Sequence, residues 1–129
     1  MVLARRGSMA GKQIVPKRGE IYLVNFDPTI GAEIKKTRPA LILQNDIGNK
    51  YSPVTIVAAI TSAIDNKQYP TEVLIKSSES GIKIDSLILL NQIRTIDKKR
   101  LIKRIGKVDQ GVLRKVNQAL QISLGLIAI

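Results

Sequence analysis

The first stretch of the sequence that suggests chemistry is a basic cluster directly before a proline and an apolar run. Residues 35–46 read KKTRPALILQND, so Lys35, Lys36 and Arg38 all precede Pro39. Positive charges this close together repel one another unless an anionic group lies nearby. Pro39 also restricts the backbone of Arg38 to extended geometry. We therefore expect Arg38 to enter a strand from a loop and to meet an anionic ligand.

The residue types that are missing narrow the chemistry further. The sequence contains no histidine and no cysteine, which excludes histidine-based triads, imidazole acid–base pairs, disulfides and the usual zinc and copper sites. Its ten acidic residues are spread singly along the chain, and a two-metal nuclease centre would require them in a tight group. We therefore expect no metal and no cofactor.

The composition is that of a folded basic protein. Lysine and arginine number 21 against 10 acidic residues, giving a net charge of +11, while 44% of the residues are hydrophobic. That apolar content is too high for a disordered basic tail. A field of this sign attracts polyanions, of which nucleic acid is the commonest, with anionic membranes and acidic protein segments as alternatives.

Cleavage of RNA is one reaction on an anionic polymer that does not need histidine, cysteine or a metal ion. RNA supplies its own nucleophile, the 2′-OH, so the protein need only hold it in line with the phosphorus and stabilise charge on the non-bridging oxygens. A guanidinium and a hydroxyl can do both. DNA has no such hydroxyl and would require a metal or a protein nucleophile.

The elements that must position these groups are mostly strands. Rough alternation of β-branched, aromatic and leucine residues between turn signals predicts six of them, at residues 19–26, 38–45, 52–61, 71–75, 85–96 and 103–108. The third has a nearly continuous apolar run, which predicts a central strand covered on both faces. Residues 45–49 and 76–83 are expected to be turn or loop.

Two aspartates mark expected helical starts. Asp97 can cap a short helical turn through residues 98–101, and Asp109 can cap an amphipathic helix whose apolar positions extend to Leu124 and Ile127. The sequence therefore predicts a mainly β fold, a small and strongly bent sheet or SH3-like barrel, with a C-terminal α-helix.

The chain length of 129 residues predicts a single domain. Residues 1–8 are interpreted as an expression-tag remnant, because Met9 follows a Gly-Ser pair and no signal-type apolar region is present; the domain is then residues 9–129. The longest apolar stretches are shorter than the ~20 residues of a membrane-spanning helix, and a cytoplasmic protein is expected.

Several separated motifs resemble one family in order and spacing. PKRGEIYLVNFDPTIGAEIKKTRPALILQND, TIVAAIT and DSLILLNQIRTIDKKRL are similar to the MazF/PemK family of toxin endoribonucleases, in particular its Gram-positive-type branch. The resemblance implies an SH3-like barrel of the MazF/PemK/CcdB type, a homodimer and a cytoplasmic type II toxin–antitoxin component. It also implies sequence-specific, metal-independent cleavage of single-stranded mRNA to 2′,3′-cyclic phosphate and 5′-OH ends, at ACA-containing, U- and A-rich sequences. The partner would be a MazE-like antitoxin with an acidic C-terminal segment.

The resemblance also implies site residues. The family's catalytic arginine falls on Arg38 and its catalytic threonine on Thr61. Because a guanidinium keeps its proton at neutral pH and is a poor general base, we expect Arg38 to stabilise phosphate charge, with Glu33 as the candidate acceptor of the 2′-OH proton. Further residues are predicted to bind RNA: Lys35, Lys36, Thr37, Asn45, Ser62, Gln92 and Arg94.

Each assignment has a structural alternative. Arg38 can be a solvated residue before a strand, and Gln92 and Arg94, whose side chains are expected on one strand face, can form a structural network instead of contacting RNA. The dense basic segment at residues 97–108 is interpreted as a solvated helix face and not as a nucleic-acid patch.

Two other functions use the same fold. One is a non-enzymatic toxin such as a CcdB-like gyrase poison, which acts through C-terminal tryptophan contacts, and this chain has no tryptophan. The other is an SH3-like nucleic-acid-binding module, which would need surface charge but neither Arg38 nor Thr61 in these motifs.

Overall fold

A computed structural model describes residues 14–26 and 37–128 of the chain. The predicted tag remnant, residues 1–8, lies outside the described residues. Within them six strands form one antiparallel sheet in the order β4-β5-β3-β2-β1-β6. The strands are β1 (Glu20–Asn25), β2 (Thr37–Ile42), β3 (Val54–Thr61), β4 (Glu72–Ile75), β5 (Ser86–Asp97) and β6 (Leu101–Lys107). The helices are α1 (Asp46–Tyr51), α2 (Ser77–Ser80), the 3₁₀ turn η1 (Lys98–Arg100) and α3 (Gln110–Ser123).

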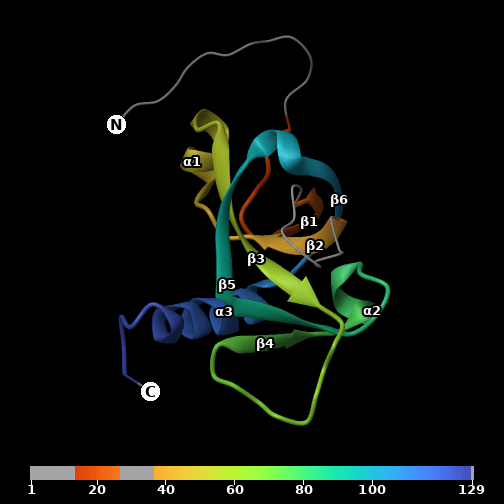
Figure 1. Cartoon of the computed structure of the whole chain (residues 1–129), viewed down its shortest axis with the longest axis vertical. Coiled ribbons are helices and arrows are strands. Elements are labelled where there is room, and N and C mark those ends of the chain that lie inside the picture. Colours follow the sequence, from red (N-terminus) through yellow and green to blue (C-terminus); the bar gives the residue numbers. More distant parts are fainter. Residues whose placement is uncertain (1–13, 27–36, 129) are drawn as a thin grey trace, which may run out of the picture.

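The sheet bends strongly, and Figure 1 shows β1, β2 and β6 curling over at one end while β4 and α3 lie at the other. Strand β5 runs the length of the molecule and carries an irregularity in its pairing with β3, between the pairs Ala58–Ile93 and Ala59–Leu89. The predicted mainly β, SH3-like architecture with a C-terminal helix is confirmed.

The bent sheet has a core on each face. One cluster lies between the sheet and α3 and includes Leu41, Ile60 and Ile88. The other lies inside the curl and includes Tyr22 and Val57. Successive residues of a strand point to opposite faces, so β3 contributes to both clusters, which confirms the prediction that it is central and covered on both sides.

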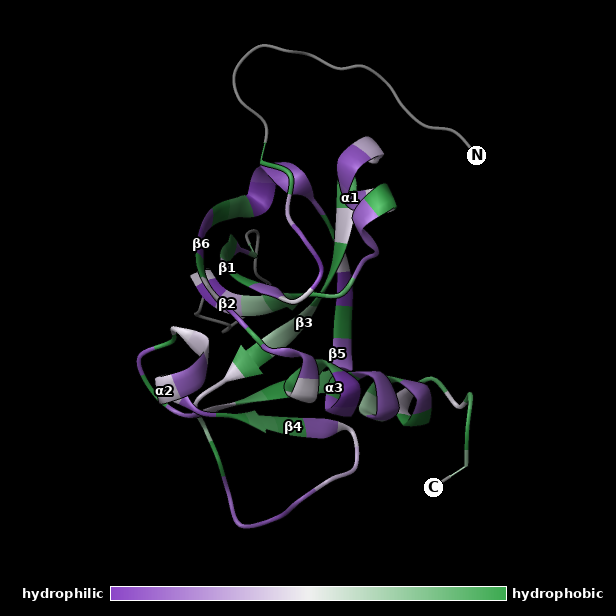
Figure 2. Cartoon of the chain, turned by 180° about the vertical axis from the view of Figure 1, so that it is seen from behind, coloured by the Kyte–Doolittle hydropathy of each residue, from purple (hydrophilic) through white to green (hydrophobic). Residues whose placement is uncertain are grey.

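The C-terminal helix begins as predicted and ends earlier. The side chain of Asp109 accepts a hydrogen bond from the backbone N–H of Val112 at 2.9 Å, which caps α3. Val116 is fully buried against the sheet, and Figure 2 shows α3 lying beside β4 and β5. The predicted extension to Ile127 is wrong, because the chain turns at Gly125, whose φ of 74° is unfavourable for other residues.

Two short helices replace predicted loops. The segment at residues 45–49, predicted as a turn, is the start of α1, and the second strand stops at Ile42 instead of residue 45. The segment at residues 76–83, predicted as a loop, contains α2. Helices of 6 and 4 residues are too short to show helical periodicity in a sequence.

The basic segment at residues 97–108 is not a helix face. Asp97 caps η1 as predicted, its side chain accepting from the N–H of Lys99 at 2.8 Å, but the chain then enters β6 and pairs with β1. Backbone pairing with β1 satisfies the groups that a helix would have bonded internally. The prediction of a solvated helix face was therefore wrong.

Lys98 in this segment is buried, with only 6% of its surface exposed. Its Nζ donates hydrogen bonds to the backbone oxygens of Asn49 at 2.5 Å and Ser52 at 2.9 Å, at the C-terminal end of α1. A cation there satisfies carbonyl groups that the helix leaves unpaired. Burial holds the pKa of Lys98 below its usual value. This lysine joins α1 to the β5–β6 connection.

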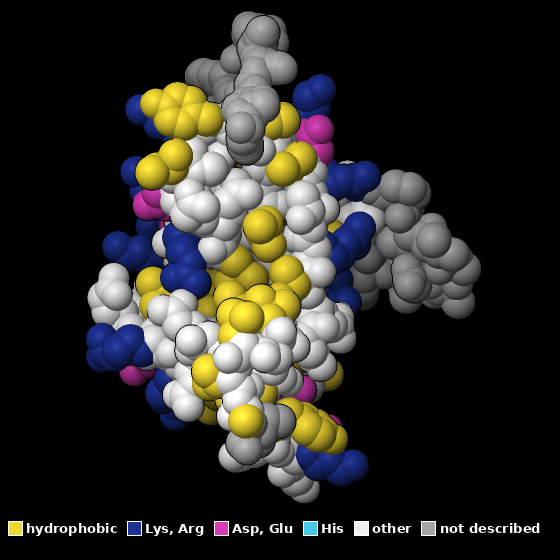
Figure 3. All heavy atoms as spheres, turned by 90° about the vertical axis from the view of Figure 1, so that its left-hand side faces the viewer, with side chains coloured by type: hydrophobic (Ala, Val, Ile, Leu, Met, Phe, Trp, Pro, Cys, Tyr) yellow, Lys and Arg dark blue, Asp and Glu magenta, His cyan; other side chains and the backbone are white. Residues whose placement is uncertain are grey.

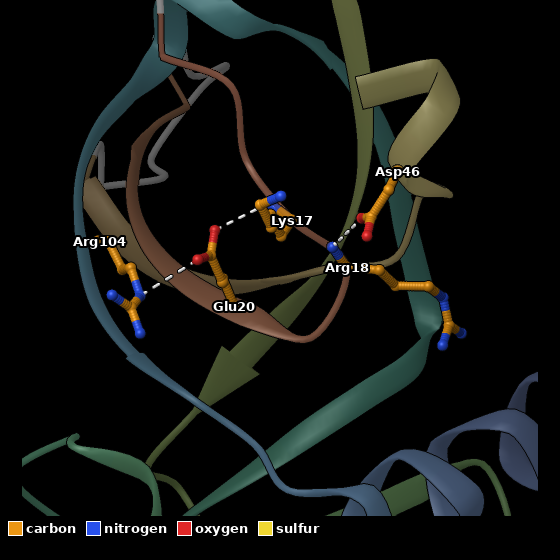
Figure 4. A network of polar contacts seen from close by, with 5 residues as sticks. All are labelled: Lys17, Arg18, Glu20, Asp46 and Arg104. Carbon is orange, nitrogen blue, oxygen red and sulfur yellow. Dashed lines mark hydrogen bonds and ion pairs between the residues drawn. The ribbon is translucent and has the colours of Figure 1, made fainter. Parts of the chain in front are cut away.

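Polar contacts also fix the chain before β1. Figure 4 shows the backbone N–H of Arg18 donating to the carboxylate of Asp46 at 2.7 Å, and the carboxylate of Glu20 receiving both the N–H of Lys17 and the guanidinium of Arg104. The Nε of Arg18 donates to a backbone carbonyl just after β2. These contacts secure the start of β1, which is the neighbour of β2. The described residues include no helix that is long and apolar enough to cross a membrane.

Candidate active site

A groove of about 290 Å³ opens where β2, β3, β4 and β5 meet. It contains three of the predicted site residues, Arg38, Thr61 and Gln92. The remaining lining residues are Ala63, Asp65, Glu72, Leu87, Leu89 and Asn91. The groove therefore combines one guanidinium, one hydroxyl, two amides and two carboxylates over a partly apolar floor.

Strand register explains why Arg38 and Thr61 lie together. Strands β2 and β3 are antiparallel, with Ala40 opposite Ala59. Side chains two residues apart on a strand share a face. The pairing ends at Ala40 and Ala59, and extending the same register by two residues would set Arg38 opposite Thr61 on the face that lines the groove. Residues opposite each other in an antiparallel pair have Cβ atoms about 4.5–5.5 Å apart. Two positions that are 23 residues apart in the sequence can thus contact one phosphate.

The guanidinium of Arg38 is available to a ligand. Arg38 is half-buried at the start of β2 and is opposite Val24 of β1. No carboxylate of the described residues forms an ion pair with it. A guanidinium offers five N–H donors in a planar fork that matches the geometry of a phosphate. Arg38 therefore brings to one end of the groove a guanidinium that forms no ion pair with a described carboxylate and can donate hydrogen bonds to a ligand.

The hydroxyl oxygen of Thr61 accepts a hydrogen bond within the protein. Thr61 Oγ1 accepts a hydrogen bond from the backbone N–H of Ala63 at 3.1 Å, the short turn that commonly follows a threonine at a strand end. This contact orients the oxygen and leaves the hydroxyl hydrogen free to be donated. Thr61 is half-buried, and Ser62 beside it is exposed. Thr61 can therefore donate to an oxygen atom of a ligand in the groove.

The irregularity in β5 brings amide groups to the groove. Ala59 lies opposite Leu89 and the adjacent Ala58 lies opposite Ile93, so residues 90–92 are extra on the β5 side. Such bulges bend a strand and redirect its side chains. Asn91 and Gln92 are both exposed and both line the groove. Sequence reasoning identified Gln92 but missed Asn91, its neighbour in the same motif.

The two groove carboxylates were also missed. Glu72 is the first residue of β4 and lies opposite Leu89 of β5, while Asp65 belongs to the connection between β3 and β4. Asp65 Oδ1 accepts the backbone N–H of Lys67 at 3.0 Å. The alternation of Glu72 with the buried Val73 and Ile75 was a signal that Glu72 lies on the opposite face of β4 from those two residues. As the first residue of an edge strand, Glu72 also lines a second pocket beside α3.

The other predicted residues lie elsewhere or outside the described residues. Glu33, Lys35 and Lys36 are in residues 27–36, which the structure does not describe. Thr37 is exposed at the first position of β2. Asn45 caps α1, its side chain accepting from the N–H of Gly48 at 2.7 Å, at the opposite end of β2 from the groove.

Arg94 has a contact that sequence reasoning did not anticipate. Its guanidinium carbon lies 5.0 Å from the centroid of the Phe26 ring, within the range of a cation–π interaction. Phe26 is buried and directly follows β1. Arg94 therefore covers an aromatic side chain at the exit of β1 and is not a lining residue of the groove. In the described part of the chain, no three acidic, histidine or cysteine side chains come together as metal ligands would.

Comparisons with known proteins identify the family of the chain. The family described as PemK-like, MazF-like toxin of type II toxin-antitoxin system matches residues 17–124. Endoribonuclease EndoA of Bacillus subtilis (strain 168) is 49% identical over 114 residues, covering 88% of this chain and 98% of that protein. Endoribonuclease MazF of Staphylococcus saprophyticus is 47% identical over 110 residues, covering 85% of this chain and 92% of that protein.

Solved structures show the same fold. A crystal structure of MazF from Deinococcus radiodurans superposes with a TM-score of 0.70 at 27% identity, covering 87% of this chain and 98% of that one. A MazE–MazF structure from the same organism has a TM-score of 0.68 at 25% identity, covering 87% of this chain and 97% of the other. The chain accordingly belongs to the PemK-like and MazF-like family of type II toxin–antitoxin toxins.

Proposed function

We propose that this protein is a toxin endoribonuclease that cleaves single-stranded mRNA in the groove formed by β2, β3, β4 and β5. The observation that carries the proposal is that a groove is lined by both Arg38 and Thr61. The family and the two relatives named as endoribonucleases support the activity. Cleavage of mRNA by such a toxin inhibits translation and growth.

The proposed reaction is a transesterification within the RNA. The 2′-oxygen forms a bond to the adjacent phosphorus while the bond from phosphorus to the 5′-oxygen breaks. The 2′-OH loses its proton to a base and the departing 5′-oxygen gains one, so the products are a 2′,3′-cyclic phosphate and a 5′-OH. No metal ion takes part in this scheme.

The groove supplies the charge stabilisation that this step needs. The guanidinium of Arg38 binds the non-bridging oxygens, on which negative charge grows in the transition state, and Thr61 donates its hydroxyl hydrogen to one of them or to the 2′-oxygen. The hydrogen bond from Ala63 holds Thr61 Oγ1 in place before the RNA arrives. Glu33 is the proposed acceptor of the 2′-OH proton.

One experiment tests this proposal. The pure protein is incubated with a long single-stranded RNA in EDTA, and the fragment ends are mapped. We expect discrete cuts with cyclic-phosphate ends, lost by at least about 10²-fold in Arg38→Ala. Arg114→Ala, which removes the same charge from an exposed position on α3, is the matched control and should cleave normally. RNA that stays intact with the wild-type protein would instead favour a binding module.

The assembly and partner are part of the same proposal. Figure 3 shows apolar side chains gathered in the middle of one face with lysine and arginine side chains on either side, and exposed apolar patches of this kind are typical of interfaces. We expect a homodimer, measurable by light scattering as twice the 14.2 kDa chain mass. A MazE-like antitoxin with an acidic C-terminal segment would bind the basic toxin in the cytoplasm, where the mRNA is.

A further inference from the structure

Glu72 is an acidic residue in a groove that is proposed to bind an anion. Among the described residues the one ion pair is Arg104 with Glu20, so no described lysine or arginine forms an ion pair with Glu72, although Lys76 and Lys115 line a neighbouring pocket with it. Glu72 is half-buried at the start of β4 and lies opposite Leu89 of β5. A carboxylate repels the phosphates of any RNA in the groove, so its presence there suggests a contact that only an acceptor can make.

The distance between Glu72 and the proposed phosphate position decides whether Glu72 can be the general base or can only contact a neighbouring base of the RNA. Strand β5 separates β4 from β3, and Leu89 is two residues away along β5 from Leu87, which lies opposite Thr61. With strands about 4.8 Å apart and about 3.3 Å per residue, the Cα atoms of Glu72 and Thr61 are about 12 Å apart. Arg38 lies one strand further away.

This distance argues against Glu72 as the general base. A base must lie about 2.6–3.2 Å from the 2′-OH proton that it accepts, and the 2′-oxygen attacks from about 3–3.5 Å. Since the phosphate is held between Arg38 and Thr61, Glu72 on the far side of β5 lies beyond that reach. A nucleotide next to the cleaved phosphate that extended across β5 would bring its base edge to Glu72, and not its reacting atoms.

The amides of Asn91 and Gln92 come from the strand that lies between the strands of Thr61 and Glu72. Both belong to β5, between β3 and β4, and both line the groove with Glu72. Carboxylates accept hydrogen bonds from the amino group of cytosine, and asparagine and glutamine bond the amino and ring-nitrogen pair of adenine. Leu87 and Leu89 form an apolar floor on which a base can rest.

We propose that Glu72, with Asn91 and Gln92, forms a base-reading subsite that selects a base carrying an exocyclic amino group, next to the cleaved phosphate. The inference rests on the proposed endoribonuclease function and adds a specificity determinant to it. Uracil has no amino group and presents a carbonyl oxygen at the corresponding place, which the carboxylate of Glu72 repels. Glu72 is therefore a selector of substrate and not a catalytic residue.

The test compares cleavage preferences of two charge-matched variants. Glu72→Gln and Glu79→Gln each remove one negative charge by the same substitution, and Glu79 is exposed on α2 and does not line the groove. Cleavage of a randomised RNA pool in EDTA is sequenced for the wild type and both variants. We expect Glu72→Gln to lose about 5- to 150-fold of its discrimination against uracil at one position flanking the cut, while Glu79→Gln keeps the wild-type preference.

A second arm measures binding without cleavage. RNA with a 2′-deoxy nucleotide at the cut cannot react, and replacing the selected base by an analogue lacking its amino group should weaken binding to the wild type but not to Glu72→Gln. If Glu72→Gln fails to fold, Glu72→Thr, which suits a strand, takes its place. Equal preference changes in both variants would overturn the proposal, as would loss of all cleavage by folded Glu72→Gln. A wild-type protein that cleaves no RNA would instead remove the proposed function.

Discussion

Replacing Thr61 by valine separates the hydroxyl from the shape of the side chain. Valine keeps the branched form that suits the end of β3 but cannot donate to a phosphate oxygen. Removing one donor that contacts developing negative charge typically lowers kcat by 10²–10³-fold, or about 2.7–4 kcal/mol. We expect a loss of this size for Thr61→Val.

The effect on stability should be much smaller. The structure shows one hydrogen bond to Thr61 Oγ1, from the exposed N–H of Ala63 at 3.1 Å. Its loss costs about 0.5–1.5 kcal/mol at most, because water can replace the acceptor. A domain stable by at least about 5 kcal/mol would remain about 99% folded, so unfolding cannot account for a hundredfold loss of activity.

Single-turnover cleavage in EDTA and thermal unfolding followed by circular dichroism measure the two effects on the same samples. Thr61→Ser is the matched variant, because it retains the oxygen that accepts from Ala63 and can donate to RNA. We expect serine to cleave close to the wild-type rate. Wild-type cleavage by Thr61→Val would refute the role of the hydroxyl, and an equal loss in both variants would show that the methyl group matters instead.

Three further variants probe other parts of the structure. Arg38→Lys keeps the charge but loses the planar fork, so its cleavage rate should lie between those of the wild type and Arg38→Ala. Gly106→Ala places a Cβ 1.8 Å from the last backbone oxygen of α2 and should lower the unfolding free energy by about 1–3 kcal/mol. Gly111→Ala is the control, because that position has space for a Cβ, and it should not lower the unfolding free energy. Equal denaturant midpoints for the two variants would contradict this expectation. Burial lowers the folded-state pKa of Lys98 below 10.5, so the unfolded state binds more protons as pH approaches 10.5 and stability rises there relative to Lys98→Met. Comparing wild type with variant cancels the opposite trend from Tyr22, whose pKa is raised by burial; parallel stability curves would refute the effect of Lys98.

Strands and capped starts could be predicted because their signals are local. Alternation of apolar residues between turn signals located all six strands, and Asp97 and Asp109 marked the two capped starts through a side-chain oxygen that satisfies a nearby N–H. A period-two pattern is readable in a strand of five or six residues, whereas a helix of that length has completed less than two turns. This is why α1 and α2 were missed while α3 was not.

The features that could not be predicted from the sequence depend on strand register and on contacts between residues that are far apart in the chain. In the sequence Lys98 does not differ from the neighbouring basic residues, because the carbonyl groups at the C-terminal end of α1 that accept its hydrogen bonds are distant in the chain. Glu72 and Asn91 became groove residues only through the pairing of β4 with β5 and the irregularity in β5. Family resemblance identified Arg38 and Thr61, but the register of β2 with β3 is what gives a physical reason for their meeting.

The charges at the two ends of the groove also define how RNA would lie in it. Arg38 on β2 attracts phosphate, while Glu72 on β4 repels it and accepts hydrogen bonds from amino groups. RNA that followed both preferences would place its backbone over β2 and β3 and turn one base toward β4, across the strand order β4-β5-β3-β2. Exchanging the charges in an Arg38→Glu and Glu72→Arg double variant would reverse these preferences without restoring cleavage, because the hydroxyl of Thr61 would remain beside the former phosphate position. Cleavage of RNA by this double variant would contradict the proposal that the phosphate must lie beside Thr61.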